Sequence, residues 1–217
     1  HTEGERKRFA RPIVESAGNR WRLTDRFVES HRSNAAFTHA VDDLIATGLD
    51  VIRSRYNVSE PFTPGRQYTR KDACRLLCWE KNVASTIYGY KVDLPTSSCP
   101  IFVTLHKSDE ISASTAYEDE LLDRYSMTWF TRSRRTLASG EVRAIVNKSA
   151  TPFVFAKKSD AEGADFYFLG RAEPHEARET TMPGDDGKPL SVVTMRLDFD
   201  QPIETAVFDY FHPVVTE

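Results

Sequence analysis

The chain has 217 residues, 40% of them hydrophobic, and a formal net charge of −3 at pH 7. This length suits one large domain or a domain with a helical appendage, and the apolar content is enough for a real core. No apolar run approaches the roughly 18 residues of a membrane span, so we expect no membrane partner. Three cysteines are too few for a disulfide framework and favour a reducing, cytoplasmic location.

The charges are unevenly distributed along the chain. Acidic residues predominate in residues 158–217, so the first 157 residues carry a net positive charge. This split is compatible with one surface that faces a polyanion and another that is solvated. An uneven surface without a function is the competing interpretation.

The first 67 residues are expected to lie outside the main domain. Residues 1–19 are polar and begin at His1 instead of Met, so we expect a flexible segment next to a tag remnant, and a longer parent protein. Residues 33–56 place apolar side chains at helical spacing behind a Ser-Asn pair that suits an N-cap. Two prolines and a glycine in residues 57–67 indicate a linker. Residues 20–67 are therefore predicted to be a helical lead-in and linker.

The remaining residues, 68–217, predict a β-rich domain. Thr69 lies three positions before Asp72, the spacing of a capping box, and predicts a short helix within residues 68–80. The chain then changes to short segments rich in β-branched and aromatic residues, which predict strands. These segments are residues 86–93, 100–107, 126–131, 141–148, 152–158, 165–170 and 190–198. One helix is expected among them, at residues 116–125. Many short strands with polar turns favour an antiparallel β-barrel with peripheral helices, an α+β fold.

Metal-binding patterns in the chain are weak. Four soft ligands are present, Cys74, Cys78, Cys99 and His106. Two cysteines one helical turn apart, without a second close pair, favour buried thiols over a zinc site. The acidic cluster around His175, residues 173–179, is interpreted as a solvated loop. We therefore predict no metal and no cofactor.

Catalytic motifs are also missing from the sequence. It has no glycine-rich phosphate loop, no nucleophile elbow and no metalloprotease helix motif. A nuclease centre needs an acidic pair and a lysine on adjoining strands, and Glu141 with Lys157 does not meet that requirement convincingly. We expect the isolated domain to be non-catalytic.

Residues 127–136, MTWFTRSRRT, combine large aromatic side chains with three arginines. Alternation along a strand places Trp129 and Thr131 on one face and Phe130 and Arg132 on the other, so the strand has no purely apolar side and is suited to line a pocket. Basic residues around it are candidates for contacts with a phosphate backbone, namely Lys107, Arg134, Arg135, Arg143 and Lys157. Core aromatics and ordinary surface arginines remain the alternative interpretation.

Several segments in order resemble a known family over residues 60–212. They include YTRKDACRLLCWE, CPIFVTLHKSDEISASTAYEDELLDRYSMTWFTRSRRT and LDFDQPIETAVFDYF. The chain is similar here to an uncharacterised C-terminal domain of many bacterial DEAD/DEAH-box (superfamily II) helicases, which also occurs fused to nuclease domains. That family resembles the PUA-like superfamily, whose SRA, EVE, YTH and ASCH relatives are compact β-barrels that bind nucleic acid. Several of these relatives flip a modified base into an aromatic-lined pocket.

The resemblance implies a base pocket, and one departure changes its chemistry. Many members have a Trp-x-Ser-Gln-Asn pattern where this chain has Trp129, Phe130, Thr131, Arg132 and Ser133. The tryptophan and a hydroxyl are retained, whereas the arginine has donors but no acceptor. The residues predicted to bind a base are Tyr68, Tyr117, Asp119, Trp129, Thr131 and Arg132. Because a carboxylate accepts from the exocyclic amine of cytosine, Asp119 favours a modified cytosine.

Three functions follow as hypotheses. The first is a reader of a modified base in DNA, with RNA as the alternative nucleic acid, which flips the base and targets a larger restriction or defence helicase or nuclease. The second is a protein-interaction or regulatory module that docks on its own helicase. The third is a nuclease, for which the sequence lacks a convincing set of metal-binding carboxylates.

Overall fold

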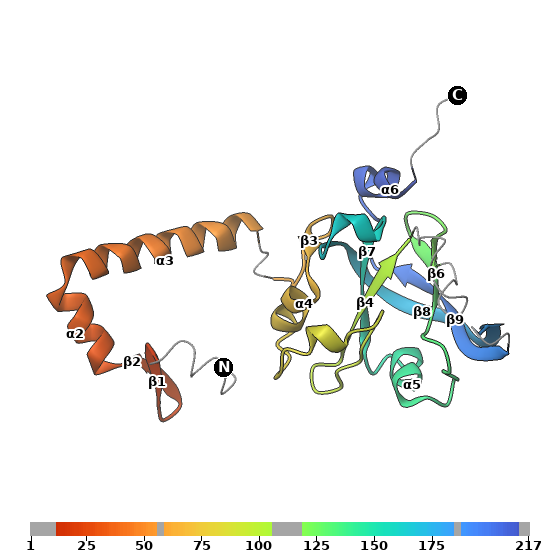
Figure 1. Ribbon diagram of the computed structural model, residues 1–217, viewed down its shortest axis with the longest axis horizontal. Coiled ribbons are helices and arrows are strands. Elements are labelled where there is room, and N and C mark those ends of the chain that lie inside the picture. The colour runs from red at the N-terminus through yellow and green to blue at the C-terminus, as the bar shows by residue number, and fades with distance from the viewer. Residues whose placement is uncertain (1–11, 56–58, 106–118, 185–187, 213–217) are drawn as a thin grey trace. The chain divides into compact units, whose positions relative to one another are not determined.

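The chain divides into two compact units, His1–Ser59 and Glu60–Glu217. The computed structural model describes residues 12–55, 59–105, 119–184 and 188–212 (Figure 1). The division between the units lies inside the segment that the sequence predicts to be a linker.

The first unit is a β-hairpin followed by two helices. Its elements are β1 (Val14–Ala17), β2 (Arg20–Leu23), α2 (Asp25–Ser33) and α3 (Ala35–Arg55). The side-chain oxygen of Asn34 accepts a hydrogen bond from the backbone N–H of Phe37 at 3.0 Å, which caps α3. Phe37 contacts Phe27 of α2 edge to face. The predicted helix is therefore present, whereas β1 lies in a segment that we expected to be flexible.

The second unit is an α+β fold with one curled sheet. Its strands are β3 (Gln67–Tyr68), β4 (Ser98–Thr104), β5 (Glu120–Leu121), β6 (Ser126–Phe130), β7 (Thr151–Lys157), β8 (Phe166–Pro183) and β9 (Pro189–Phe199). Its helices are α4 (Arg70–Leu76), α5 (Gly140–Val146) and α6 (Thr205–Phe211), with the 3₁₀ turns η1 (Ala84–Thr86) and η2 (Asp160–Glu162).

The strand order is β4-β7-β8-β9-β6-β5, and β3 pairs with β8. Neighbouring strands run antiparallel except for β4 and β7, which are parallel. The chain travels from β4 to β7 through β5, β6 and α5, and a crossover of this length permits parallel pairing. The prediction of a purely antiparallel sheet is wrong at this pair.

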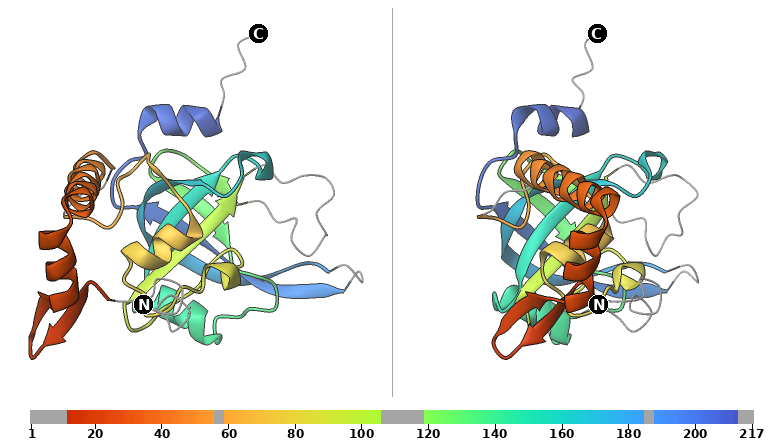
Figure 2. Two further views of the ribbon diagram at one scale, coloured as in Figure 1. Left: turned by 60° about the vertical axis from the view of Figure 1, so that its left-hand side comes forward. Right: turned by 90° about the vertical axis from the view of Figure 1, so that its left-hand side faces the viewer.

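The curl of the sheet comes from its two longest strands and from irregular pairing. β8 pairs with β3 and β7 near its start and with β9 further on. The register shifts between His175 and Arg178 and between Val154 and Phe155, and such bulges bend and twist strands. The far part of the β8–β9 hairpin extends past the other strands (Figure 2). Among the described residues β4 and β5 do not pair with each other, so the sheet forms a half barrel instead of the predicted barrel.

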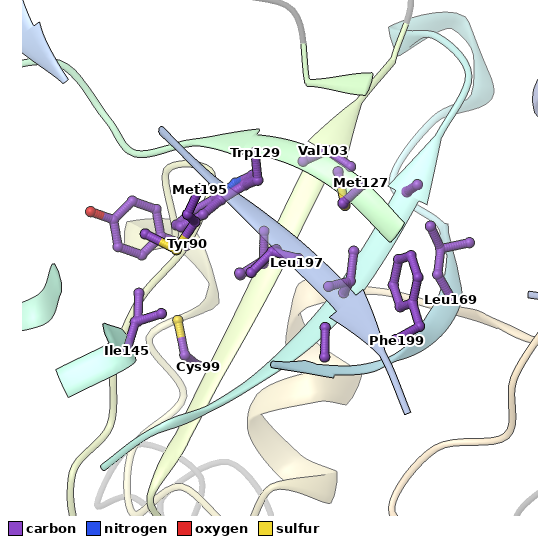
Figure 3. Packing of buried hydrophobic residues seen from close by; sticks show 14 of the residues in the cluster. Tyr90, Cys99, Val103, Met127, Trp129, Ile145, Leu169, Met195, Leu197 and Phe199 are labelled. Atoms are coloured by element: carbon purple, nitrogen blue, oxygen red, sulfur yellow. The ribbon is translucent and has the colours of Figure 1, made fainter. Parts of the chain in front are cut away.

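The sheet buries side chains on both faces. Along β7, Val154 and Ala156 belong to an inner cluster, part of which Figure 3 shows between the strands. Alternate residues, Phe153 and Phe155, point to the other face and pack on Phe62. The second cluster is made of aromatic rings from Phe62, Tyr68, Phe102, Phe153, Phe155, Phe166 and Phe168. The near-continuous apolar sequence of this strand reflects burial on both sides.

Residues 141–148, predicted to be a strand, form α5. Val142 and Ile145 are both fully buried, which is the i, i+3 spacing of a helix face. A strand was predicted because the segment is short and contains β-branched residues. Lys148 ends the helix with φ of +58° and donates its backbone N–H to the Ile145 carbonyl. A short apolar run of this kind satisfies both periods, and packing decides between them.

Other expected elements differ because their conformation depends on distant partners. Residues 119–125, the described part of the expected helix at 116–125, contain β5 and bends instead. Residues 86–93 form isolated bridges, one of them between Tyr90 and Ile101. Residues 173–179, expected to be a loop, belong to β8.

The helix expected within residues 68–80 is present as α4, and its capping box forms as predicted.

A protein containing only residues 60–217 should unfold in one cooperative transition at the melting midpoint of the full chain. The reason is that the buried hydrophobic side chains extend from Phe62 to Phe211. Circular-dichroism melts of the two proteins measure this. A fragment that begins at residue 84 lacks α4, Phe62 and Tyr68, and it should not fold cooperatively. A broad, early melt of the 60–217 fragment would contradict the division.

Candidate nucleic-acid interface

A pocket of about 620 Å³ is lined by residues from the start of α4, the η1 region and the ends of β4 and β6. Its volume lies within the roughly 300–1,000 Å³ of small-ligand sites. Its aromatic lining consists of Tyr88, Tyr90, Phe102, Trp129 and Phe130. Its charged lining consists of Arg70, Asp119, Arg132 and Asp160. Flat rings together with both donors and acceptors are what a heterocyclic base requires.

Two neighbouring tyrosines have opposite environments in the pocket wall. Tyr90 is 1% exposed and packs edge to face on Trp129, with 5.0 Å between ring centroids. Figure 3 shows Tyr90 and Trp129 at one end of the inner cluster, with the Tyr90 oxygen pointing away from the cluster. Tyr88 is 69% exposed. Gly89 between them has φ of +76°, which glycine adopts at little cost and which lets the two rings diverge. Tyr88 is therefore an exposed aromatic surface that a ligand can reach.

Asp119 supplies a hydrogen-bond acceptor in the pocket. It is a buried residue, and one carboxylate oxygen accepts the backbone N–H of Phe130 at 3.0 Å. This bond holds the carboxylate beside the last residue of β6. A carboxylate has two oxygens and about four lone-pair positions, so its acceptor capacity exceeds one such bond.

The carboxylate of Glu141, at the start of α5, binds three side chains beside the pocket. The Tyr90 hydroxyl donates to one oxygen at 2.7 Å. Arg132 donates from one nitrogen to both oxygens, at 2.9 and 2.7 Å, and its guanidinium lies 4.8 Å from the Tyr90 ring centroid. Arg135 donates its Nε to the same carboxylate. We call Glu141, Tyr90, Arg132 and Arg135 the Glu141 cluster.

Protonation in the Glu141 cluster follows from this geometry. Burial by itself would raise the pKa of Glu141, but the hydrogen bonds from Arg135, Tyr90 and Arg132 outweigh it and leave that pKa below its usual value. Burial, and then the bond to Glu141, raise the pKa of Tyr90. The cluster therefore consists of an ionised carboxylate, a neutral phenol and charged guanidinium groups.

The loop after β6 is anchored to the β8–β9 hairpin. The Thr131 hydroxyl accepts the backbone N–H of Val193 at 2.9 Å. The backbone N–H of Arg135 donates to the Ser191 carbonyl at 3.2 Å. Arg134 lies between these anchors with φ of +61°, an unusual conformation for a residue with a side chain, and it is exposed. The anchors thus present Arg134 to solvent.

The six residues predicted to bind a base have different positions. Asp119, Trp129 and Arg132 line the pocket together. Trp129, however, is 2% exposed and belongs to the core, so its ring is not the open stacking surface we predicted. Tyr117 lies outside the described residues.

Tyr68 and Thr131 do not line the pocket, and their predicted roles are corrected. Tyr68 is 1% exposed and packs on Phe62, and its hydroxyl accepts the backbone N–H of Thr63 at 2.9 Å. Thr131 is fully buried, and its hydroxyl is bonded to β9. Both residues stabilise the fold, because neither side chain reaches solvent.

The predicted phosphate-binding residues also divide into groups. Arg134 and Arg143 are exposed. Arg135 is half-buried and paired with Glu141. Lys157 is 6% exposed and binds Asp160 at 2.8 Å and the Gly163 carbonyl at 3.0 Å, so its predicted role is corrected to an internal one. Lys107 lies outside the described residues.

Sequence reasoning missed Tyr88, Tyr90 and Arg70 as pocket residues. The Tyr-Gly-Tyr run was a usable signal, because a glycine between two aromatics permits the turn that points them in different directions. Arg70 carries no such signal. It reaches the pocket because α4 places it over Phe102 of β4 and Phe166 of β8, 32 and 96 positions further along the chain.

Within the described part of the chain, no group of three or more His, Cys, Asp or Glu side chains is arranged to hold a metal ion. The three cysteines are free; Cys74 and Cys99 are buried, as expected, whereas Cys78 is exposed. No helix in the described ranges has the length and apolar character needed to cross a membrane.

Replacing Glu141 by Gln should lower the free energy of unfolding at pH 7 by about 1–3 kcal/mol, because charge-assisted hydrogen bonds are lost. The pKa of Glu141 is lower in the folded than in the unfolded chain. Ionised Glu141 therefore contributes fully to the free energy of unfolding at pH values above its usual pKa of 4.5, and this contribution is lost as the pH falls through the pKa of the folded state. The deficit of the variant should therefore shrink between pH 7 and pH 3 in urea titrations. Glu120→Gln, at an exposed position of β5, is the control. A deficit that is equal at both pH values would contradict this account.

Parts of three solved structures are similar to this chain. One is the MspJI restriction endonuclease in complex with a 27-mer oligonucleotide, at 12% identity over 52% of this chain and a TM-score of 0.39. Another is the sulfur-binding and SRA domains of ScoMcrA complexed with phosphorothioated DNA, at 11% identity, 70% coverage and a TM-score of 0.39. The third is KRYPTONITE in complex with mCHG DNA and SAH, at 12% identity, 65% coverage and a TM-score of 0.42. The chain spans 32%, 45% and 33% of these proteins, respectively.

A family model matches most of the second unit. No curated protein matches the chain. Residues 62–211, which include α4, the whole curled sheet and α6, match the family described as Domain of unknown function (DUF3427). The chain therefore belongs to the DUF3427 family.

Proposed function

We propose that residues 60–217 form a non-catalytic domain that reads a modified base, a modified cytosine in DNA, by taking the extruded base into the pocket beside Asp119. The observation that carries this proposal is the convergence of an exposed ring, a carboxylate and a fixed guanidinium on one pocket of about 620 Å³. These groups match the flat faces and polar edges of a nucleobase.

The pocket's polar groups favour a base with an exocyclic amine. Asp119 accepts hydrogen bonds, as required to pair with the amino group of cytosine. Arg132 donates only, so it suits a carbonyl oxygen or ring nitrogen. Because Glu141 holds Arg132 with two hydrogen bonds, the guanidinium is oriented before any ligand arrives. Such preorganisation lowers the cost of binding.

Extruding a base requires compensation both inside and outside the pocket. Unstacking costs a few kcal/mol, and stacking on an aromatic ring contributes about 1–3 kcal/mol per base. Tyr88 is the exposed ring suited to this stacking. Arg134 and Arg143, both exposed, are suited to bind the phosphate backbone without reading sequence.

The larger role that we infer is targeting. The resemblance of this sequence to the C-terminal domains of superfamily II helicases and nuclease fusions supports a reader that directs such a motor or nuclease, in a restriction or defence protein of the cytoplasm. The domain itself supplies binding, and its partners are DNA and the catalytic domains of its own parent protein. A regulatory module that docks on its helicase is the alternative. It would gain support if the protein bound no nucleic acid in a salt-dependent manner.

Replacing Tyr88 by Ala should weaken binding to a duplex with a single extrudable modified cytosine by about 1–3 kcal/mol, because one stacking surface is lost. Affinities for duplexes carrying 5-methylcytosine, 5-hydroxymethylcytosine or no modification are measured by fluorescence anisotropy. The melting temperature should not change, because Tyr88 is exposed. Tyr125→Ala is the matched control, since Tyr125 is 59% exposed and does not line the pocket. If both variants bind alike, the pocket is not the base site.

Replacing Arg134 or Arg143 by Ala should lower the affinity for modified and for unmodified duplexes by the same factor. Each lost phosphate contact should reduce the slope of log K against log salt by about 0.9. The ratio of the affinities for modified and unmodified DNA should stay unchanged. Arg20→Ala, on β2 of the first unit, serves as the control with the same charge change. A changed ratio with an unchanged salt slope would show that these arginines contact the base and not the backbone.

A further inference from the structure

Arg70 is the first residue of α4, directly after the residue that caps this helix. The preceding Thr69 accepts the backbone N–H of Asp72 at 3.1 Å, and the Asp72 carboxylate accepts the backbone N–H of Thr69 at 3.0 Å. This capping box fixes the start of the helix. The Arg70 guanidinium lies 5.2 Å from the Phe102 ring centroid and 4.8 Å from that of Phe166. It lines the same pocket as Asp119 and Arg132.

Arg70 has no hydrogen-bond acceptor among the residues that the structure describes. Its Nε is buried without a hydrogen-bond partner. Burial lowers the pKa of Arg70, and the charge of Asp160 only partly opposes this effect. The Asp160 carboxylate forms an ion pair with Lys157 at 2.8 Å, so its charge is shared between two cations. A half-buried charge without a partner is costly, and proteins normally provide one.

The other arginine of the pocket shows the contrast. Arg132 also has a buried Nε without a partner, but its terminal nitrogen donates two hydrogen bonds to Glu141. The remaining carboxylate of the pocket, Asp119, accepts the Phe130 N–H. Asp160 pairs with Lys157, and Arg132 pairs with Glu141. Arg70 instead makes cation–π contacts with Phe102 and Phe166, and no described residue accepts a hydrogen bond from it.

We propose that Arg70 binds a phosphate oxyanion, so that the pocket takes a nucleotide and not a base alone. A guanidinium presents its donors in a planar fork that matches two phosphate oxygens. Cation–π contacts with Phe102 and Phe166, whose planes differ by 74°, restrict where this fork lies. The phosphate can belong to the chain of the nucleic acid, next to the extruded base, or to a free nucleoside monophosphate. The first source rests on the proposed function, whereas the second does not.

The first experiment is a double-mutant cycle with DNA. Duplexes with one 5-methylcytosine carry either ordinary phosphodiesters or an uncharged methylphosphonate on one side of that nucleotide. Arg70→Gln should weaken binding to the ordinary duplex by about tenfold to a hundredfold, as expected for a charge-assisted hydrogen bond. With the methylphosphonate at the contacted position, the same substitution should have little further effect. Arg75→Gln, on the exposed side of α4, removes the same charge outside the pocket and should show no such coupling.

The second experiment uses calorimetry with deoxycytidine and with deoxycytidine 5′-monophosphate. If the effect of Arg70→Gln depends on the DNA phosphate in the first experiment, the anion site is supported and the nucleic acid supplies its phosphate. If wild-type protein prefers the monophosphate and Arg70→Gln loses that preference, while no duplex shows coupling, the anion site stands and its source is a free nucleotide; the DNA-reading function then fails separately. If Arg70→Gln behaves like Arg75→Gln in every titration, the proposal is overturned.

Folding of the variant is measured alongside binding. Arg70→Lys keeps the charge but loses the planar fork, so it should retain the salt dependence of binding and lose most of the affinity gained from the phosphate. If Arg70→Gln does not fold, Arg70→Lys is tested in the same cycle. Full wild-type affinity in a folded Arg70→Lys protein would overturn the role of the fork.

Discussion

The carboxylate of Glu141 determines how the candidate pocket is organised. One side chain at the start of α5 receives hydrogen bonds from Tyr90, Arg132 and Arg135. Tyr90 in turn packs on Trp129, which belongs to the inner cluster of the sheet. The orientation of the pocket arginine is thereby connected to the core. Removing the carboxylate would leave two half-buried guanidinium groups without a partner, and such groups would destabilise the site more than the loss of a surface ion pair.

The curled sheet is what brings these groups together. Parallel pairing places the end of β4 beside β7, while β6 lies on the opposite side of the β8–β9 hairpin. The hairpin also anchors the loop that follows β6, through Val193 and Ser191. The sheet therefore presents a short loop with one exposed arginine, Arg134, in a left-handed backbone conformation, an arrangement common at binding sites.

The two arginines of the pocket, Arg132 and Arg70, differ in their hydrogen-bond partners and are therefore suited to different ligand groups. Arg132 is bound to a carboxylate before any ligand arrives, so it acts as a fixed donor at the pocket wall. Arg70 is held by cation–π contacts with two aromatic rings and has no hydrogen bond to a described residue. The fixed guanidinium of Arg132 favours selectivity for one polar edge of a base. The environment of Arg70 favours a negatively charged ligand, since only an anion compensates for the desolvation of the guanidinium.

Local patterns determined part of this protein. The capping box at Thr69 and the apolar run of β7 specify their own conformations. Alternation along residues 127–136 suggested that the strand of Trp129 and Arg132 lines a pocket, whereas Asp119 was expected only from the family resemblance; all three line the pocket. The sequence alone could not assign α5, whose short apolar run fits both helical and strand periods. Only the tertiary structure decided that Trp129, Tyr68 and Lys157 are buried, and that Tyr88 and Arg70 face the pocket. The physical reason is that exposure and pairing depend on which distant strands the chain packs against, and no local periodicity encodes those contacts.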